Sequence, residues 1–282
     1  MSTTNAEQIA DWNGAQGQRW ATLRREIDGI VAPFGEAALR LAAPQVGERV
    51  VDIGCGCGDT SIELARAVGQ TGEVLGVDVS RPMLDVARAQ AGLAGWGKLA
   101  FREADAAEAA LPADVDLLFS RFGVMFFGQP VPAFRHLRGS LRSQGRFVFV
   151  CWRAPRDNGW AMTPLAAARQ AMNITPVPAD PNAPGPFAFA DDERLRGILA
   201  DAGFEKASIQ RFDAPIHLGA TPRAAAENAA RIGPVSRFVR EVGIESLPVI
   251  VDAIESALRP LAAPDGRVSL VGSTWLVVAS NP

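Results

Sequence analysis

The sequence predicts an α/β fold in which a doubly wound parallel sheet is covered by helices on both faces. Short apolar runs alternate with segments of helical periodicity along most of the chain, which is the pattern of right-handed βαβ units. The apolar runs are short and continuous, as expected of strands that are buried on both faces. With 282 residues, 48% of them hydrophobic, the chain can bury a large core, and wholesale disorder is excluded.

Seven apolar segments are expected to form the strands of this sheet. The first, VVDIG, runs into a glycine-rich turn, and the fifth, RFVFVCW, is entered through the turn Ser143-Gln144-Gly145. The expected strands are residues 50–54, 73–78, 98–105, 114–120, 146–152, 206–212 and 274–279.

Helices are expected between these strands, wherever apolar residues recur with helical spacing. The segment after the first strand, DTSIELARAVG, and residues 131–141 both show that spacing. Ser80 is the expected N-cap of the helix after the second strand, with Pro82 in its first turn. Asp191 is expected to cap a later helix that ends at Gly203.

Three segments fall outside this alternation. Residues 1–44 are expected to hold an amphipathic helix, because four apolar residues recur there at near-helical spacing. Residues 154–190 contain seven prolines, too many for regular structure, and residues 214–265 are expected to contribute two or three helices. The apolar stripe of the first segment consists of Trp20, Leu23, Ile27 and Ile30.

We expect residues 1–282 to form a single domain. Within it, residues 45–153 carry the first five strands and would form the ligand-binding core. The three irregular segments would then act as covers over the carboxyl edge of the sheet, where folds of this type bind their ligands.

Charge and composition disfavour several classes of function. The chain has 28 Lys and Arg against 31 Asp and Glu, a formal net charge of -3, which disfavours binding to the nucleic-acid backbone. We expect neither a signal peptide nor a membrane span, because the sequence lacks the apolar runs that these need. The spacing of Cys55, Cys57 and Cys151 fits neither a disulfide framework nor a zinc site. We therefore expect a cytoplasmic protein that acts on a small molecule.

The phrase VVDIGCGCGDTS carries the strongest chemical signal. Glycines at 54, 56 and 58 let the chain turn sharply with its backbone close to a ligand, and the next helix directs free N–H groups toward that ligand. Asp78 ends the second strand about 20 residues later, where an acid accepts hydrogen bonds from ribose hydroxyls. These features predict a nucleoside-bearing cofactor. The glycines run G-x-G-x-G, however, and not G-x-G-x-x-G as in dinucleotide-binding proteins.

This phrase resembles motif I of the class I S-adenosylmethionine-dependent methyltransferases, (V/L)(D/E)xGxGxG. Four later segments resemble the same family at matching spacing, namely VLGVDVSRPML, READAAEAALP, DVDLLFSRFGVMFF and LRSQGRFVFVCW. The resemblance covers residues 45–153, and DWNG…GQRW near the N-terminus resembles a small-molecule subgroup of the ubiquinone and menaquinone biosynthesis type. It implies a Rossmann-like seven-stranded sheet with helical insertions, and S-adenosylmethionine as the cofactor.

The resemblance also implies roles for residues at the first two strand ends. Gly54, Cys55 and Gly56 would line the methionine part of the cofactor. Asp78 would hold the ribose through its carboxylate. Asp52, two residues before the first glycine, is expected to satisfy amides of the loop and to contact the cofactor only indirectly.

The adenine would lie beside the ends of the second and third strands. Val79 and Met83 would pack against it, Asp105 would accept from its amino group, and the backbone N–H of Ala106 would meet the ring. Two neighbouring glutamates could take the place of Asp105.

Candidate catalytic groups are few. Ser120 and Arg121 would face the methyl donor from the end of the fourth strand, and Trp20 is expected to close partly over the cofactor. His217 is the candidate general base, with an ordinary strand-end histidine as the alternative. Methyl transfer does not always need a base, because alignment of the acceptor can supply most of the acceleration. The fourth strand lacks the acidic ligand of catechol-type enzymes, so no metal is expected.

The sequence thus predicts direct displacement of a methyl group from S-adenosylmethionine to an oxygen, nitrogen or carbon atom of a small molecule. An apolar or aromatic acceptor is indicated by large residues in the cover segment that follows the fifth strand, with packing alone as the alternative role of these residues. Two alternatives stay open: a catalytically silent protein that binds the cofactor, and an NAD(P)-dependent oxidoreductase, which the glycine spacing and the absence of tyrosine disfavour. The oligomeric state is also open, with a homodimer among the alternatives. The large residues are Trp160, Met162, Met172, Phe187 and Phe189.

Overall fold

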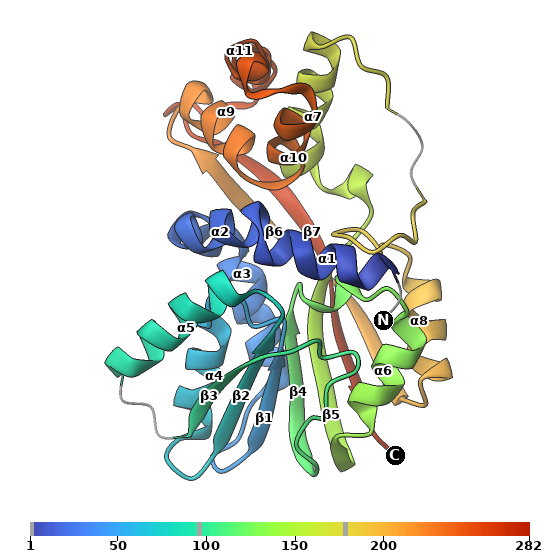
Figure 1. Ribbon diagram of the computed structural model, residues 1–282. Helices are drawn as coiled ribbons and strands as arrows, with labels where there is room; N and C mark the ends of the chain where they lie inside the picture. The colour runs from blue at the N-terminus through green and yellow to red at the C-terminus, as the bar shows by residue number, and fades with distance from the viewer. Residues whose placement is uncertain (1–2, 95–97, 177–179) are drawn as a thin grey trace. The chain divides into compact units, whose positions relative to one another are not determined.

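The computed structural model describes residues 3–94, 98–176 and 180–282. The chain forms two compact units. Figure 1 shows the ribbon coloured from blue at the N-terminus to red at the C-terminus. Of the three expected cover segments, the first belongs to the first unit, and the other two lie mostly in the second. The single-domain organisation and the covering role stay predictions. The first unit comprises Met1–Cys151, Asn182–Phe212 and Thr274–Pro282, and the second comprises Trp152–Pro181 and Asp213–Ser273.

Seven strands form one sheet, in the order β3-β2-β1-β4-β5-β7-β6, which confirms the predicted α/β architecture. Each predicted segment overlaps one strand, and the last three strands are longer than predicted. The strands are β1 (Arg49–Ile53), β2 (Glu73–Asp78), β3 (Leu99–Glu103), β4 (Val115–Arg121), β5 (Leu141–Trp152), β6 (Glu205–Gly219) and β7 (Val268–Ser280).

Parallel pairing brings the carboxyl ends of the central strands to one edge of the sheet. β1 pairs in parallel with β2 and β4, β2 pairs with β3, and β4 pairs with β5. In this register Asp52 of β1 lies between Gly76 of β2 and Phe119 of β4. The ends of β1, β2 and β4 therefore meet at one place, which we call the carboxyl edge.

The seventh strand departs from the predicted parallel sheet. Asn281 N donates to Gly145 O (2.8 Å) and Gln144 N donates to Asn281 O (3.1 Å), whereas Arg153 N donates to Ser273 O (3.0 Å). Residue numbers fall along β7 as they rise along β5, so these two strands run antiparallel.

The turn expected at residues 143–145 is built into β5 and does not precede it. β5 begins at Leu141, and the register of its pairing with β4 shifts between Val115 and Leu117. Gln144 has a positive φ of 59°, and this local turn accommodates the extra residues of β5 at the register shift. The predicted start of this strand was therefore wrong, because pairing continues through the irregularity.

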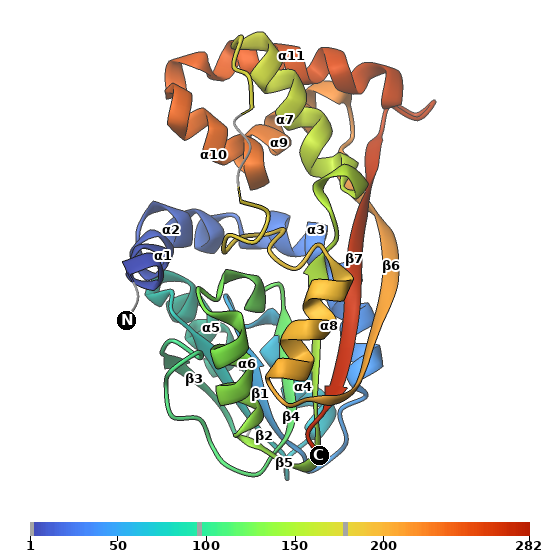
Figure 2. The ribbon, with the colours of Figure 1, turned by 90° about the vertical axis from the view of Figure 1, so that its right-hand side faces the viewer.

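Helices flank both faces of the sheet in the first unit. α4 and α5 lie on one side of the strands, and α6 and α8 lie against each other on the other side (Figures 1 and 2). Asp191 caps α8 as predicted, since its carboxylate accepts from Glu193 N (2.9 Å) and Arg194 N (3.1 Å). The helices of this unit are α1 (Thr3–Asn13), α2 (Ala15–Thr22), α3 (Arg24–Ala42), α4 (Asp59–Val68), α5 (Arg81–Ala94), α6 (Pro130–Arg138) and α8 (Asp192–Asp201).

The N-terminal segment forms three helices where the sequence predicted one. Gly14 leaves the helical conformation between α1 and α2 (φ -92°, ψ -141°), and a second break follows at Leu23. Leu23 and Ile27 are buried, but Trp20 and Ile30 are partly exposed. The residues of the expected stripe are therefore divided between two helices and do not form one continuous buried face.

Phe134 of α6 is the centre of an aromatic core in the first unit. Its ring centroid lies 5.6 Å from that of Phe147, 5.7 Å from Phe149 and 5.7 Å from Phe189. Phe189 was expected to face an apolar acceptor, but it is 1% exposed in this core. Packing, the alternative that the sequence left open, is therefore the role of Phe189 in the structure, because the segment carrying it returns to the first unit and packs against α6.

The described part of the second unit is mainly helical, with the end of β6 and the start of β7. Three helices follow β6, as predicted for residues 214–265, and α7 contacts all of them. α7 contradicts the expectation that prolines exclude regular structure from residues 154–190. Pro164 lies inside it and is buried, so packing of the helix outweighs the backbone hydrogen bond that proline cannot make. The helices are α7 (Gly159–Ala171), α9 (Pro222–Arg231), α10 (Gly233–Val242) and α11 (Leu247–Leu258).

A buried asparagine holds the start of α7 in the second unit. Asn158 Nδ2 donates to Ala154 O (3.1 Å) and Ser273 O (3.2 Å), and Asn158 Oδ1 accepts from Ser273 N (2.9 Å) and Trp160 Nε1 (3.1 Å). Each polar atom of this side chain has a partner, as burial requires. Trp160, one of the residues expected to face an acceptor, is thereby fixed beside Trp152.

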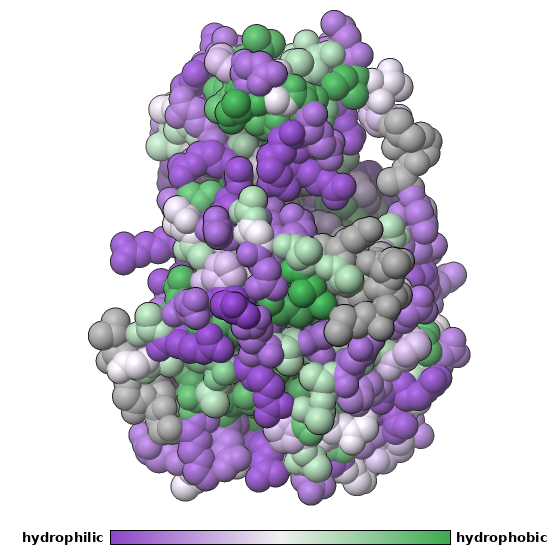
Figure 3. All heavy atoms as spheres, in the orientation of Figure 1, coloured by the Kyte–Doolittle hydropathy of each residue, from purple (hydrophilic) through white to green (hydrophobic). Residues whose placement is uncertain are grey.

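Figure 3 shows that polar residues cover most of the face it draws. None of the helices described here is long and apolar enough to cross a membrane. Large apolar side chains that are exposed include Val46, Ile244 and Val249.

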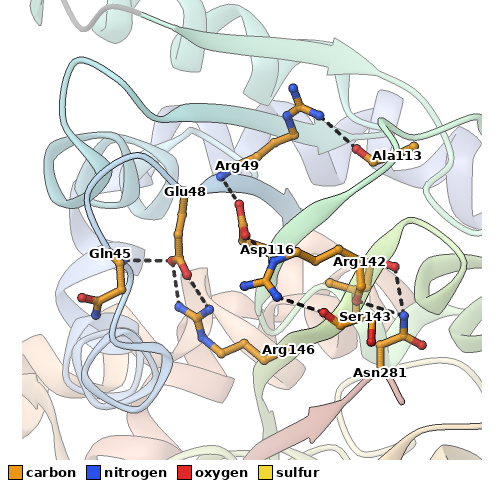
Figure 4. A network of polar contacts seen from close by, with 10 residues as sticks. Gln45, Glu48, Arg49, Ala113, Asp116, Arg142, Ser143, Arg146 and Asn281 are labelled. Carbon is orange, nitrogen blue, oxygen red and sulfur yellow. Dashed lines mark hydrogen bonds and ion pairs between the residues drawn. The ribbon is translucent and has the colours of Figure 1, made fainter.

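At the edge of the sheet opposite the carboxyl edge, ion pairs join the starts of the central strands (Figure 4). The carboxylate oxygens of Glu48 lie 2.7 and 2.8 Å from the two terminal nitrogens of Arg146. Arg146 Nε donates to Ala42 O at the end of α3 (2.8 Å), and Asp116 accepts from Arg49 N (2.8 Å). This network fixes α3 relative to β1, β4 and β5.

We expect Glu48→Gln to lower the free energy of unfolding by about 1–3 kcal/mol. Arg146 stays in the same partly buried position but loses a carboxylate that accepts from two of its nitrogens. Urea denaturation of both proteins measures this difference. Glu36→Gln is the matched control, since Glu36 and Arg40 form an exposed, 3.8 Å pair on α3. Equal destabilisation by the two substitutions would contradict the role assigned to Glu48.

Candidate functional site

The glycine-rich loop after β1 has the strained backbone that its sequence predicts. Gly54, Gly56 and Gly58 have φ values of +68°, +56° and +86°, which side-chain-bearing residues rarely adopt. A Cβ atom at Gly56 would lie 2.8 Å from Met83 Cε. The loop therefore needs glycine both for its conformation and for its close approach to α5.

A second loop, after β4, packs directly against the first. A Cβ atom at Gly54 would lie 2.6 Å from Gly123 Cα, and a Cβ atom at Gly123 would lie 2.6 Å from Ile53 O. Phe122 precedes this contact with a φ of +63°, a strained value for a residue with a side chain. Ser120 Oγ donates to Ile53 O (2.7 Å) and accepts from Gly123 N (3.2 Å). Ser120 thus joins β4 to β1, and its hydroxyl hydrogen is already used.

Asp78 holds the glycine-rich loop from the end of β2. Its Oδ2 accepts from Gly56 N (2.8 Å) and its Oδ1 accepts from Ser80 N (2.8 Å). Burial raises the pKa of this carboxyl group, and these hydrogen bonds oppose the rise. A carboxylate has about four acceptor sites, so Asp78 can still accept hydrogen bonds from a ligand.

Asp52 is fully buried at the end of β1 and has one unused oxygen. Its Oδ2 accepts from Thr60 Oγ1 (2.7 Å) and Ser61 Oγ (2.7 Å), both in the first turn of α4. Its Oδ1 has no hydrogen-bond partner among the described residues. Burial raises the pKa of Asp52 to about 6. The sequence led us to expect loop amides as partners, but hydroxyl groups of the next helix take that place.

The third strand brings Asp105 and Ala106 to the same edge. Ala104 N donates to Asp78 O (2.9 Å), and Asp105 Oδ1 accepts from Ala107 N (2.9 Å). Asp105 is half-buried and Ala106 is buried. Glu103, one of the two glutamates that could replace Asp105, instead forms an ion pair with Arg81 at 3.0 Å.

Apolar residues beside the glycine-rich loop are buried or half-buried. Met83 is buried on α5, and Val79 is half-buried between β2 and that helix. Cys55, Cys57 and Cys151 are free and buried. Burial raises the pKa of all three thiols, that of Cys57 to about 12, so they act as small packing groups. No group of three or more metal-binding side chains occurs in the part of the chain that is described.

The N-terminal helices reach the carboxyl edge through aromatic and polar contacts. The ring centroid of Trp12 lies 5.5 Å from that of Trp20 and 5.4 Å from that of Phe126, which follows β4. Asn13 Nδ2 donates to Val79 O (2.8 Å), directly after Asp78. Sequence reasoning selected Trp20 but missed Asn13 and Phe126, whose positions depend on contacts between distant segments.

α3 is joined to both loops by ion pairs one helical turn apart. Arg24 donates to Asp59, at the start of α4, with a shortest distance of 2.7 Å. Arg121 Nη1 donates to Asp28 (2.7 Å), and the Arg121 side chain is 15% exposed. A Cβ atom at Gly35 would lie 2.7 Å from Arg121 Cδ, so the stem of Arg121 lies against this glycine. Arg121 thus lies at the carboxyl edge with part of its guanidinium not engaged by Asp28.

The two histidines belong to different units, His136 to the first and His217 to the second. His217 is exposed on the part of β6 that belongs to the second unit, with Nδ1 3.3 Å from Ser269 Oγ. His136 Nε2 lies 2.8 Å from Ala109 O. A role of His217 as general base stays a prediction.

We expect Asp52 to make stability depend on pH in an identifiable window. Its pKa is about 6 in the folded protein and near 4 when unfolded, so the folded state keeps a proton that the unfolded chain releases. The contribution of Asp52 to stability is therefore lost as pH rises from about 4 to 6. Relative to Asp52→Asn, the wild type should lose at most about 1.4 kcal/mol per pH unit in this window. Denaturation series at several pH values measure the difference, and parallel curves would contradict it.

Comparison with known proteins supports the same family along the same residues. A family model described as a methyltransferase domain matches residues 50–145. The aklanonic acid methyltransferase of Streptomyces sp. (strain C5) is 33% identical over 119 residues, which are 42% of this chain and 54% of that protein. The nocamycin O-methyltransferase of Saccharothrix syringae is 31% identical over 181 residues, 61% of this chain and 64% of that protein. These matches thus span between half and two thirds of each relative.

Longer matches exist at lower identity. The ubiquinone/menaquinone biosynthesis C-methyltransferase of Azotobacter vinelandii is 28% identical over 203 residues, 65% of this chain and 78% of that protein. Among solved structures, the YcgJ protein of Bacillus subtilis superposes with a TM-score of 0.58 and 19% identity, over 88% of this chain and 98% of that one. The latter likeness shows the fold alone. The motifs at the carboxyl edge, the strand order and the family match over residues 50–145 all support a class I S-adenosylmethionine-dependent methyltransferase domain.

Proposed function

We propose that the protein transfers a methyl group from S-adenosylmethionine to a small, apolar or aromatic acceptor. The observation that carries the proposal is the arrangement of Asp52 and Asp78 around the glycine-rich loop. The half-buried carboxylate of Asp78 retains acceptor capacity there, and one oxygen of the buried Asp52 has no partner in the described chain. A cationic nucleoside with ribose hydroxyls satisfies such a site.

The residues of the carboxyl edge fit this cofactor. S-adenosylmethionine supplies an electrophilic methyl group on a sulfonium centre. In our proposal Asp78 accepts from the ribose hydroxyls at acceptor sites that are not used by Gly56 N and Ser80 N. Val79, Met83, Asp105 and Ala106 lie beside it at the ends of β2 and β3 and would hold the adenine.

The methionine end would lie over Gly54, Cys55 and Gly56. Asp52 would act there through its charge, because a cation nearby offsets the burial that raises its pKa. Ser120 supports this end indirectly, since its hydroxyl holds the β4 end against Ile53. Trp20 would limit access of water together with Trp12.

An apolar acceptor is supported by aromatic residues at the carboxyl edge. Phe126, Trp12 and Trp20 form one partly exposed group there, and Phe122 lies against Phe34 with centroids 6.1 Å apart. The related proteins are named for aklanonic acid, nocamycin, and ubiquinone or menaquinone. We place Arg121 on the acceptor side, where its guanidinium would orient an oxygen of the acceptor.

In the proposed mechanism the chain contributes alignment and charge more than proton transfer. The whole sequence contains no tyrosine and two histidines; His136 contacts Ala109 O in the first unit, and His217 belongs to the second unit. Holding the acceptor in line with the methyl donor can supply most of the acceleration. A cytoplasmic location, action without a metal and a possible homodimeric state are parts of this proposal that rest on the sequence.

Asp78→Ala should weaken the affinity for S-adenosylhomocysteine by about 1–3 kcal/mol, because hydrogen bonds to a charged group are lost. Calorimetric titration measures the dissociation constant directly. Asp85→Ala on α5 is the control, because Asp85 is exposed and pairs only with Arg88 in the same helix turn. An unchanged affinity in Asp78→Ala would mean that the ribose is held elsewhere.

The activity itself is tested with a labelled methyl donor and a panel of hydroxylated aromatic, quinol and enol acceptors. We expect one methylated product and one S-adenosylhomocysteine per turnover with at least one acceptor class. Tight binding of S-adenosylhomocysteine without product from any acceptor would favour a silent binding protein. Absence of binding would overturn the proposal, and binding of NAD(P) in its place would favour the oxidoreductase.

A further inference from the structure

The N-terminal helices are hydrogen-bonded to the chain segment that directly follows Asp78. Asn13 Nδ2 donates to Val79 O (2.8 Å), and Arg81 N donates to Asn13 Oδ1 (3.0 Å). One amide side chain thus bridges both ends of the three-residue turn Val79–Arg81, which we call the ribose turn. The same Nδ2 also donates to Ile9 O (3.0 Å), so the side chain is held in place by its own helix.

The ribose turn also holds α1. Ser80 Oγ donates to Trp12 O (2.7 Å), which lies at the end of the helix next to Asn13. Ser80 is fully buried, and its hydroxyl is used by this contact and not by an N-cap bond of its own helix. Three hydrogen bonds therefore join residues 12–13 to residues 79–81, across 66 or more positions of sequence.

Gly17 explains how the helices come close enough for these contacts. A Cβ atom on Gly17 would lie 1.9 Å from Trp12 O and 2.5 Å from Ser80 Oγ. α2 also packs on α5, which begins at Arg81. The conformation of the segment DWNG…GQRW therefore depends on the position of the ribose turn, and the turn depends on the segment.

The turn is in contact with the carboxylate that our proposed function assigns to the ribose. Ser80 N donates to Asp78 Oδ1 (2.8 Å), so a shift of the turn moves a hydrogen bond on that carboxylate. Arg81 is held on its other side by Glu103 of β3 (3.0 Å). A loss of Asn13 would leave Val79 O and Arg81 N without their side-chain partner and loosen the turn on the side of α1.

We propose that Asn13 is a positioning residue for the adenosine half of the cofactor. It acts through Val79 and Arg81 and fixes the ribose turn, and with it Asp78, in the conformation that binds ribose. The inference rests on the proposed function, because it assumes that Asp78 holds the ribose. It assigns to the N-terminal segment a part in cofactor affinity that is separate from covering the site.

The test is the affinity of the full chain for two ligands, S-adenosylhomocysteine and 5′-methylthioadenosine, which lacks the amino-acid group. Asn13→Ala should weaken both affinities by a similar factor, on the order of tenfold, because the loss affects the shared adenosine half. Asn228→Ala is the matched control, since Asn228 donates to a backbone carbonyl, Leu218 O, in the second unit. Its affinities should equal those of the wild type.

Ser80→Ala weakens the same contact between α1 and the ribose turn from the other side. It is the alternative variant if Asn13→Ala is poorly folded. In the double variant the two losses should be less than additive, because both remove one docking contact. Asn13→Ala within twofold of the wild type, or a loss confined to S-adenosylhomocysteine, would overturn the inference while leaving the proposed function intact. Wild-type protein that binds neither ligand would instead overturn the proposed function.

Discussion

The close approach of the β1 and β4 backbones at their carboxyl ends is the constraint on which the site depends. Gly54 and Gly123 lie so close that a side chain on either would overlap the other strand's backbone. Ser120 closes the contact by donating to Ile53 O, and the strained φ of Phe122 turns the chain into it. Because the glycine-rich loop starts at this contact, its conformation is set by the sheet before any ligand arrives. Such preorganisation reduces the ordering cost of binding.

The charges at the carboxyl edge follow from the same packing. Asp52 and Asp78 lie on adjacent strands, burial raises the pKa of both, and the charge of Asp78 raises the pKa of Asp52 further. Two such carboxylates are costly without a cation, because burial disfavours their charged forms. Arg121 offsets this cost only in part, since one of its nitrogens is engaged by Asp28 of α3. The site therefore has an unmet preference for positive charge, which is the property that a sulfonium ligand requires.

The local sequence pattern was sufficient to predict where the strands lie and which residues stand at their ends. Buried parallel strands are continuous apolar runs, so all seven could be located, and Asp78 follows from its spacing after Gly58. Gly123 and Asn13 could not be found in this way, because their importance comes from partners on other strands and helices. The direction of β7 and the helix around Pro164 were likewise decided by tertiary contacts.

The groups available at the carboxyl edge also limit how the acceptor can be activated. Asp52 and Asp78 are committed to α4 and to the glycine-rich loop, and Asp28 is paired with Arg121. A guanidinium cannot accept a proton near neutral pH, but it stabilises an oxygen that carries negative charge. An acceptor that has already released its proton to solvent near neutral pH, such as an acidic enol beside a carbonyl group, would reach this site already nucleophilic. Such an acceptor needs only to be held in line, and the rigid contact between β1 and β4 provides a fixed platform for that alignment.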